Sequence, residues 1–97
     1  MIIHMVLFKL TDRSPANIEQ TRELLLSMNG KIPLLRHLEV GEDVIHSERS
    51  YDLALVTKFD SLDDLRAYQI HPYHASQVLP HTQNVSSSVV TVDYESK

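Results

Sequence analysis

The sequence predicts an α+β domain of ferredoxin-like type, with the order β-α-β-β-α-β and helices on one face of a four-stranded antiparallel sheet. Two observations lead to this expectation. Four apolar, strand-like segments are separated by two segments that carry helix-capping signals. The first and third strand segments are also apolar on both faces, which two helices cannot cover. A second copy packing sheet against sheet is the economical cover, so we expect a homodimer.

The first strand is expected at "IIHMVLFKL", residues 2–10. Alternation divides it into one face with Ile3, Met5 and Leu7 and a second face with Ile2, His4, Val6, Phe8 and Leu10. A helix is predicted next, with Ser14 as N-cap, Pro15 at the first helical position and Gly30 just past the end. Its apolar stripe consists of Ile18, Thr21, Leu25 and Met28, flanked by Leu24.

Two further strands follow, at residues 32–43 and 51–59, joined by a polar turn. In the second of these, alternation places Leu53, Leu55 and Thr57 opposite Asp52, Ala54 and Val56.

The second helix is expected to begin after the cap Ser61, with Asp63 and Asp64 in a first turn that the helix dipole favours. Because His71 precedes Pro72, we expect the helix to break there. A short helical piece should follow and end near Pro80. The last strand is predicted at 86–96, with Val89 and Thr91 opposite Val90, Val92 and Tyr94.

Length and composition limit the classes of function. The 97 residues are expected to form a single domain, 1–97. A net charge of −4 without a basic patch argues against nucleic-acid binding. The apolar run at the start is too short to span a membrane and lacks the flanks of a signal peptide, so we expect no membrane association and a cytoplasmic location.

Metal and nucleotide sites are not expected. The chain has no cysteine, and Pro72 interrupts the helical geometry that would bring His71 and His74 onto one face. Its two glycines lie outside any phosphate-binding motif. The sequence therefore predicts neither a metal ion nor a cofactor.

Three stretches, "HMVLFKL", "YDLALVTKFDSLDDLRAYQIHPYH" and "VVTVDYE", together with the element order, resemble the stress-responsive α/β-barrel (Dabb) family over essentially the whole chain. The strand-one histidine and the Y-x-x-H-P-x-H stretch are the most telling marks. The resemblance implies a homodimeric α+β barrel, and the plant member named next works without an organic cofactor. Most members have no established reaction, but a plant member, olivetolic acid cyclase, closes a linear polyketide by aldol condensation.

That resemblance implies a catalytic pair, Tyr68 and His74, and a pocket histidine, His4. A further pocket histidine of the cyclase falls on Asp52, so this sequence departs there. The aromatic wall that the first helix of the cyclase contributes is also absent. The resemblance thus implies a pocket with an acid–base pair, but for another substrate.

We expect a pocket between helices and sheet, with a floor of His4, Val6 and Phe8 from the first strand and Asp52, Ala54 and Val56 from the third. Within it a histidine can take a proton from a carbon next to a carbonyl, and a tyrosine hydroxyl can stabilise the enolate. The alternative is that His71 and His74 cap the broken helix while Tyr68 packs on the sheet.

The leading hypothesis is a homodimer whose small apolar pocket binds a small hydrophobic or carbonyl-bearing molecule. Its enzymatic version is a cofactor-free proton transfer of the cyclase, isomerase or lyase kind. The alternatives are a cofactor-independent monooxygenase of the same fold class and a non-catalytic structural stress protein.

Overall fold

The structure, a computed structural model, describes all residues from 1 to 97. Its elements in chain order are β1 (Ile2–Leu10), α1 (Pro15–Leu26), β2 (His37–Glu42), β3 (Leu53–Phe59), α2 (Leu62–Ile70), the π-helix η1 (Tyr73–Val78), α3 (Leu79–Val85) and β4 (Ser86–Glu95). None of the helices has the length and apolar character that crossing a membrane would require.

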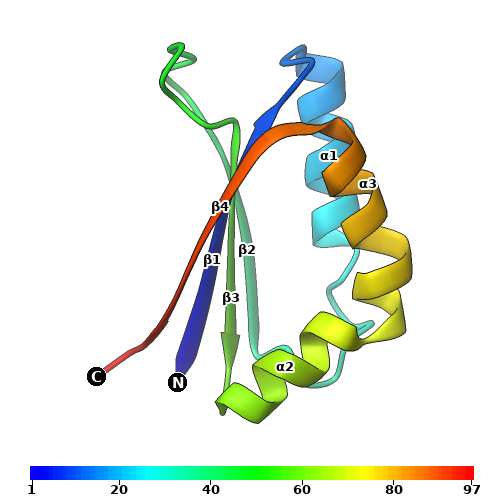
Figure 1. Ribbon diagram of the computed structural model, residues 1–97, viewed down its shortest axis with the longest axis vertical. Coiled ribbons are helices and arrows are strands. Elements are labelled where there is room, and N and C mark those ends of the chain that lie inside the picture. Colours follow the sequence, from blue (N-terminus) through cyan, green and yellow to red (C-terminus); the bar gives the residue numbers. More distant parts are fainter.

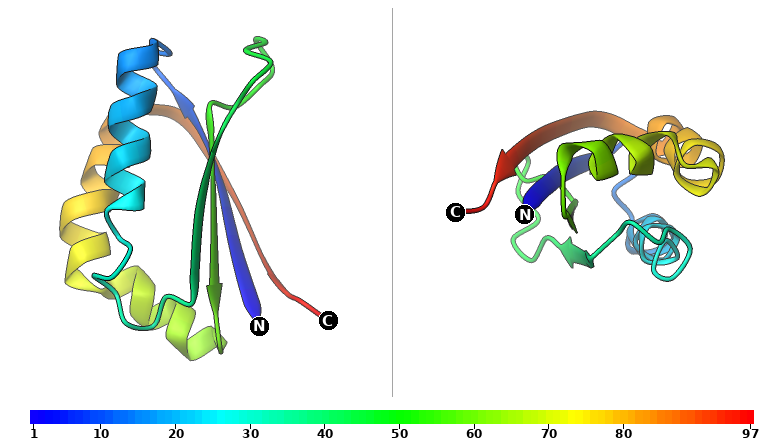
Figure 2. Two further views of the ribbon diagram at one scale, coloured as in Figure 1. Left: turned by 180° about the vertical axis from the view of Figure 1, so that it is seen from behind. Right: turned by 90° about the horizontal axis from the view of Figure 1, so that it is seen from below.

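The four strands form one antiparallel sheet in the order β2-β3-β1-β4. All the helices lie on the same side of this sheet, and its other side carries no element of the chain (Figure 1, Figure 2). The predicted α+β, ferredoxin-like fold is therefore confirmed.

The helix starts follow the capping residues that the sequence indicated. The side chain of Ser14 accepts a hydrogen bond from the Asn17 amide at 3.3 Å, and that of Ser61 accepts one from the Asp64 amide at 3.1 Å. After α1 the chain turns through Gly30, whose φ of 80° lies in the left-handed region that glycine adopts without strain. Local side-chain chemistry thus sets where both helices begin.

The helical segment between α2 and β4 differs from expectation at one point. The break before Pro72 is confirmed, since His71 ends α2 with an extended ψ of 135°. The expected end near Pro80 is wrong, because α3 continues to Val85. Pro80 lies in the first turn of α3, where a missing N–H costs little, so it permits the helix instead of ending it.

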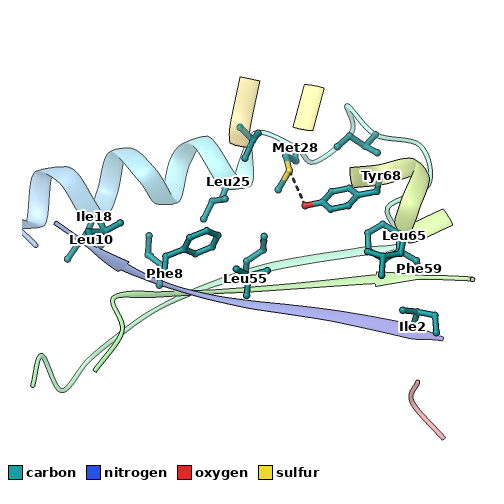
Figure 3. Packing of buried hydrophobic residues seen from close by; sticks show 14 residues of the cluster. Ile2, Phe8, Leu10, Ile18, Leu25, Met28, Leu55, Phe59, Leu65 and Tyr68 are labelled. Atoms are coloured by element: carbon teal, nitrogen blue, oxygen red, sulfur yellow. Dashed lines mark hydrogen bonds between the residues drawn. The ribbon is translucent and has the colours of Figure 1, made fainter. Parts of the chain in front are cut away.

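A single hydrophobic core lies between the helices and the side of the sheet that they cover (Figure 3). It comprises Ile2, Val6, Phe8, Leu10, Ile18, Leu25, Met28, Ile32, Leu53, Leu55, Phe59, Leu65, Tyr68 and Val78. The predicted helical stripe of α1 faces this core, and the alternate residues of β1 and β3 supply its floor.

The pairing of β1 with β3 corrects one expectation about the floor. Val6 lies opposite Leu55 and Phe8 lies opposite Leu53. Directly opposed residues of an antiparallel pair share a face, so β3 presents Leu53 and Leu55 beneath the helices. Successive side chains of a strand point to opposite faces, so Asp52, Ala54 and Val56 lie on the other side from Leu53 and Leu55. The expectation that they share a face with His4, Val6 and Phe8 is wrong.

The uncovered side of the sheet carries an apolar patch. We call it the open sheet face; β1, β3 and β4 contribute Met5, Leu7, Ala54, Val56, Val90, Val92 and Tyr94 to it. Its β4 side chains are about half exposed, at 45% for Val90, 51% for Val92 and 44% for Tyr94. Contiguous exposed apolar surface of this kind marks an interaction site.

Asp52 has a structural position just before β3. Its carboxylate is 2% exposed and accepts hydrogen bonds from the Leu10 amide at 2.8 Å and from Arg13 Nε at 2.9 Å. Arg13 also donates to the carbonyl oxygens of Ser47 and Ser50. The carboxylate therefore ties the end of β1 to the loop between β2 and β3.

Replacing Asp52 with alanine should destabilise the fold by about 3–5 kcal/mol, because Arg13 and the Leu10 amide would lose a buried partner. Urea denaturation followed by circular dichroism measures this loss. The matched control is Asp60→Ala, which breaks an exposed pair with Arg36 and should cost less than about 1 kcal/mol. Equal losses in the two variants would contradict the structural role of Asp52.

Candidate functional site

A cavity of about 360 Å³ lies between the helices and the covered face of the sheet. Its walls come from every helix and from strands β1, β3 and β4, and are formed by His4, Val6, Phe8, Leu25, Leu55, Tyr68, Gln69, His74, Val78, Leu79, Thr82, Gln83, Val89 and Thr91. The structure thus brings five of the predicted site residues together: His4, Val6, Phe8, Tyr68 and His74. Most of the wall is apolar, as in small-molecule sites generally.

Tyr68 lies on α2 with its side chain fully buried. Its ring packs against Phe59 and His74, with centroid distances of 4.9 and 4.6 Å. The hydroxyl donates to Met28 Sδ at 3.6 Å (Figure 3), and a thioether is a weak acceptor that a ligand oxygen can replace. Burial raises the pKa of the hydroxyl above its ordinary value of 10.0, so it remains a protonated donor at neutral pH.

His74 lies in the first turn of η1, just after the break. Its Nδ1 is 3.0 Å from the carbonyl oxygen of Gln69. A carbonyl can only accept, so Nδ1 carries the proton and Nε2 is left as a proton acceptor. Desolvation lowers the pKa of His74 below its ordinary 6.5; nearby His4 lowers it further, while the Gln69 carbonyl opposes both. At neutral pH His74 is therefore an uncharged base.

His4 on β1 is buried, and its Nδ1 contacts the carboxylate of Asp93, its partner residue on β4. The ring meets that of Tyr68 edge-on, at a centroid distance of 6.0 Å. Because the carboxylate engages Nδ1, it fixes the orientation of the imidazole and leaves Nε2 for the cavity. The sequence prediction missed Asp93, although it shares the parity of Val89 and Thr91, which line the cavity.

Other predicted or candidate residues lie elsewhere. Asp52 and Ala54 are absent from the cavity wall; Asp52 holds Arg13, and Ala54 belongs to the open sheet face. His71 accepts a hydrogen bond at Nδ1 from the Tyr73 amide at 3.1 Å and so caps the helix break. No three His, Cys, Asp or Glu side chains cluster as a metal site would require.

A four-stranded antiparallel sheet with helices on one face and an apolar cavity between the layers defines a ferredoxin-like α+β domain. The chain belongs to the Stress responsive A/B Barrel Domain family, Dabb, whose family profile matches residues 2–96.

Three of the relatives are more than 30% identical to this chain. SCO4036, an uncharacterized protein of Streptomyces coelicolor, is 33% identical over 81 residues, 80% of this chain and 84% of that protein. A dimeric ferredoxin-like protein of Bacteroides fragilis is 32% identical with a TM-score of 0.83, covering 98% of this chain and 95% of its own. A similar dimeric protein of Thermobifida fusca is 31% identical with a TM-score of 0.85, covering 98% and 90%. Both solved structures are described as proteins of unknown function.

Two enzymes share the fold at much lower identity. Hydroxynitrile lyase of Passiflora edulis is 16% identical with a TM-score of 0.81, covering 96% of this chain and 90% of its own. An antibiotic biosynthesis monooxygenase is 12% identical with a TM-score of 0.73, covering 100% and 99%. At these identities the likeness shows the fold alone, and the chemistry must be argued from the cavity.

The depressed pKa of His74 should make the fold sensitive to acid. Below about pH 6.5 an unfolded histidine takes up a proton that the folded one resists, so stability should fall as the pH drops through that value. The variant His74→Asn should lose less stability than the wild type between pH 7 and pH 5, as followed by thermal denaturation at each pH.

The control for this comparison is Asn84→Ala, an exposed substitution on α3 that leaves every ionisable group in place. Its stability should follow the wild-type pH profile. A His74→Asn profile parallel to that of the wild type would show that folding does not depress the pKa of His74.

Proposed function

We propose that this protein binds a small hydrophobic, carbonyl-bearing molecule in its cavity and transfers a proton at the carbon next to the carbonyl, without a cofactor. One observation carries the proposal: the ring of an uncharged His74 and the ring of a protonated Tyr68 lie in contact in the wall of one largely apolar cavity. A base and a hydrogen-bond donor in that relation are what enolate formation requires.

The proposed step transfers a proton from the carbon next to the carbonyl to His74. Nε2 of His74 takes the proton, the electron pair of the broken C–H bond forms a C=C bond, and the carbonyl π pair moves to oxygen. The Tyr68 hydroxyl turns from Met28 Sδ and donates to this oxygen, where charge develops. Reprotonation at another carbon then completes isomerisation, and expulsion of a leaving group from the β-carbon completes lyase chemistry. Attack of the enolate carbon on a second carbonyl, whose oxygen takes up the proton from His74, completes cyclisation.

The remaining predicted site residues orient the ligand in this proposal. Val6 and Phe8 form apolar floor beneath it. Nε2 of His4, held in place through Asp93, supplies a second polar contact. Binding that holds the reacting carbon next to His74 accelerates the reaction strongly, because the two groups are already oriented before the chemical step begins.

The test is exchange of α-hydrogen for deuterium in 2-tetralone, a neutral ketone, followed by proton NMR in D₂O. Wild-type protein should accelerate the exchange, and His74→Asn and Tyr68→Phe should each lower the acceleration by about 100-fold or more. Tyr68→Phe keeps the buried ring and loses only a bond to sulfur, so its melting temperature should change little.

The matched control is Tyr51→Phe, which removes a hydroxyl bonded to Ser88; neither residue belongs to the cavity wall. This variant should exchange at the wild-type rate. Equal rates in all four proteins would contradict the proton-transfer function, and oxygen consumption without exchange would favour the monooxygenase alternative.

We also propose that the chain works as a homodimer, with the open sheet faces of two copies packed together. That face is apolar and about half exposed on β4, and the B. fragilis and T. fusca relatives are described as dimeric. In a dimer with two-fold symmetry, the same apolar surface of each copy packs against that of the other and is removed from water.

Sedimentation equilibrium at micromolar concentration should give twice the 11.1 kDa of one chain. Val92→Glu places a carboxylate on the open sheet face and should shift the protein towards monomer. Val44→Glu is the control, because this loop valine is 81% exposed already and its variant should remain dimeric. A wild-type mass of one chain would rule out the dimer.

A further inference from the structure

We propose that the cavity accepts uncharged carbonyl compounds and rejects their carboxylate counterparts, because its wall offers an anion no counterion. This inference rests on the proposed function and names the substrate class of the same site. It concerns the charge of the ligand, which neither the fold nor the family assignment specifies.

No side chain of the wall carries a permanent positive charge. The cavity contains no lysine, arginine, aspartate or glutamate side chain, and its ionisable groups are His4, Tyr68 and His74. Tyr68 is a protonated phenol and His74 a neutral imidazole, for the reasons of burial given above. The other polar groups are the amides of Gln69 and Gln83 and the hydroxyls of Thr82 and Thr91.

A formal negative charge lies behind the wall. It belongs to Asp93, whose carboxylate contacts Nδ1 of His4. Because His4 is already engaged there, it is no free counterion for a ligand. The chain as a whole carries a net charge of −4, which acts in the same direction.

The proposed reaction keeps the cavity electrically balanced only for a neutral ligand. Transfer of a proton from a neutral ketone to neutral His74 creates an enolate beside an imidazolium, so the two new charges compensate each other. A ligand that enters as a carboxylate brings a second negative charge, which must be desolvated without a partner. Burying an unpaired charge in an apolar site is strongly unfavourable.

The probes are 2-naphthamide and 2-naphthoate, which have the same shape and number of heavy atoms and differ in charge. Binding of each to the wild-type protein is followed by NMR titration of the Tyr68 and His74 ring resonances. We expect the amide to bind at least about tenfold more tightly than the carboxylate, since tenfold corresponds to only about 1.4 kcal/mol.

A matched pair of variants tests the cause. Gln83 lines the cavity and has an exposed side chain, so Gln83→Lys brings an ammonium group to the rim without burying it. The next residue, Asn84, is exposed but lies off the wall, so Asn84→Lys adds the same charge elsewhere. Gln83→Lys should reduce the amide-to-carboxylate preference at least about fivefold, and Asn84→Lys should leave it nearly unchanged.

Wild-type protein that binds 2-naphthoate as tightly as 2-naphthamide at these resonances would overturn charge selection while leaving the binding cavity in place. If Gln83→Lys and Asn84→Lys changed the amide-to-carboxylate preference equally, the missing positive charge at the rim of the cavity would not be the cause of that preference. If neither compound moves the Tyr68 and His74 resonances, both this inference and the proposed ligand-binding function are wrong.

Discussion

The pairing of β1 with its two neighbours is the constraint on which the rest of the structure depends. β1 lies between β3 and β4, so its registers with them decide which side chains share each face of the sheet. The even-numbered residues of β1, among them His4, Val6 and Phe8, lie beneath the helices together with Leu55 of β3 and Thr91 of β4. The odd-numbered residues of β1 and the residues paired with them form the open sheet face. A slip of one residue would exchange the two surfaces and destroy both.

The helix break at Pro72 provides the second half of the site. An uninterrupted helix would carry residues six apart to different faces, because each residue advances by about 100°. The turn at His71 redirects the chain so that Tyr68, before the break, and His74, after it, bring their rings into contact. The hydrogen bond from Tyr73 to Ser27 then fastens the start of η1 to the end of α1.

The sequence predicts most of the fold because its signals are local. Capping serines, the residue before Pro72 and the alternation within each strand act over a few positions, and the structure follows them. The register between β1 and β3 is set by residues about fifty positions apart in the sequence. Alternation within one strand does not determine it, and for this reason Asp52 and Ala54 were assigned to the wrong face of the sheet. Within the candidate site, the family resemblance was sufficient to predict Tyr68 and His74. The Asp93 partner of His4 required the β1–β4 register, which alternation alone does not fix.

β4 forms cavity wall on one face, through Val89 and Thr91, and open sheet face on the other, through Val90 and Val92. As an edge strand it is held by β1 alone within the chain. In the proposed dimer the partner would restrain this strand from outside, and the wall of the cavity would become more rigid. Thermodynamic linkage then makes the effect reciprocal: subunit association favours ligand binding, and a bound ligand strengthens the association of the subunits.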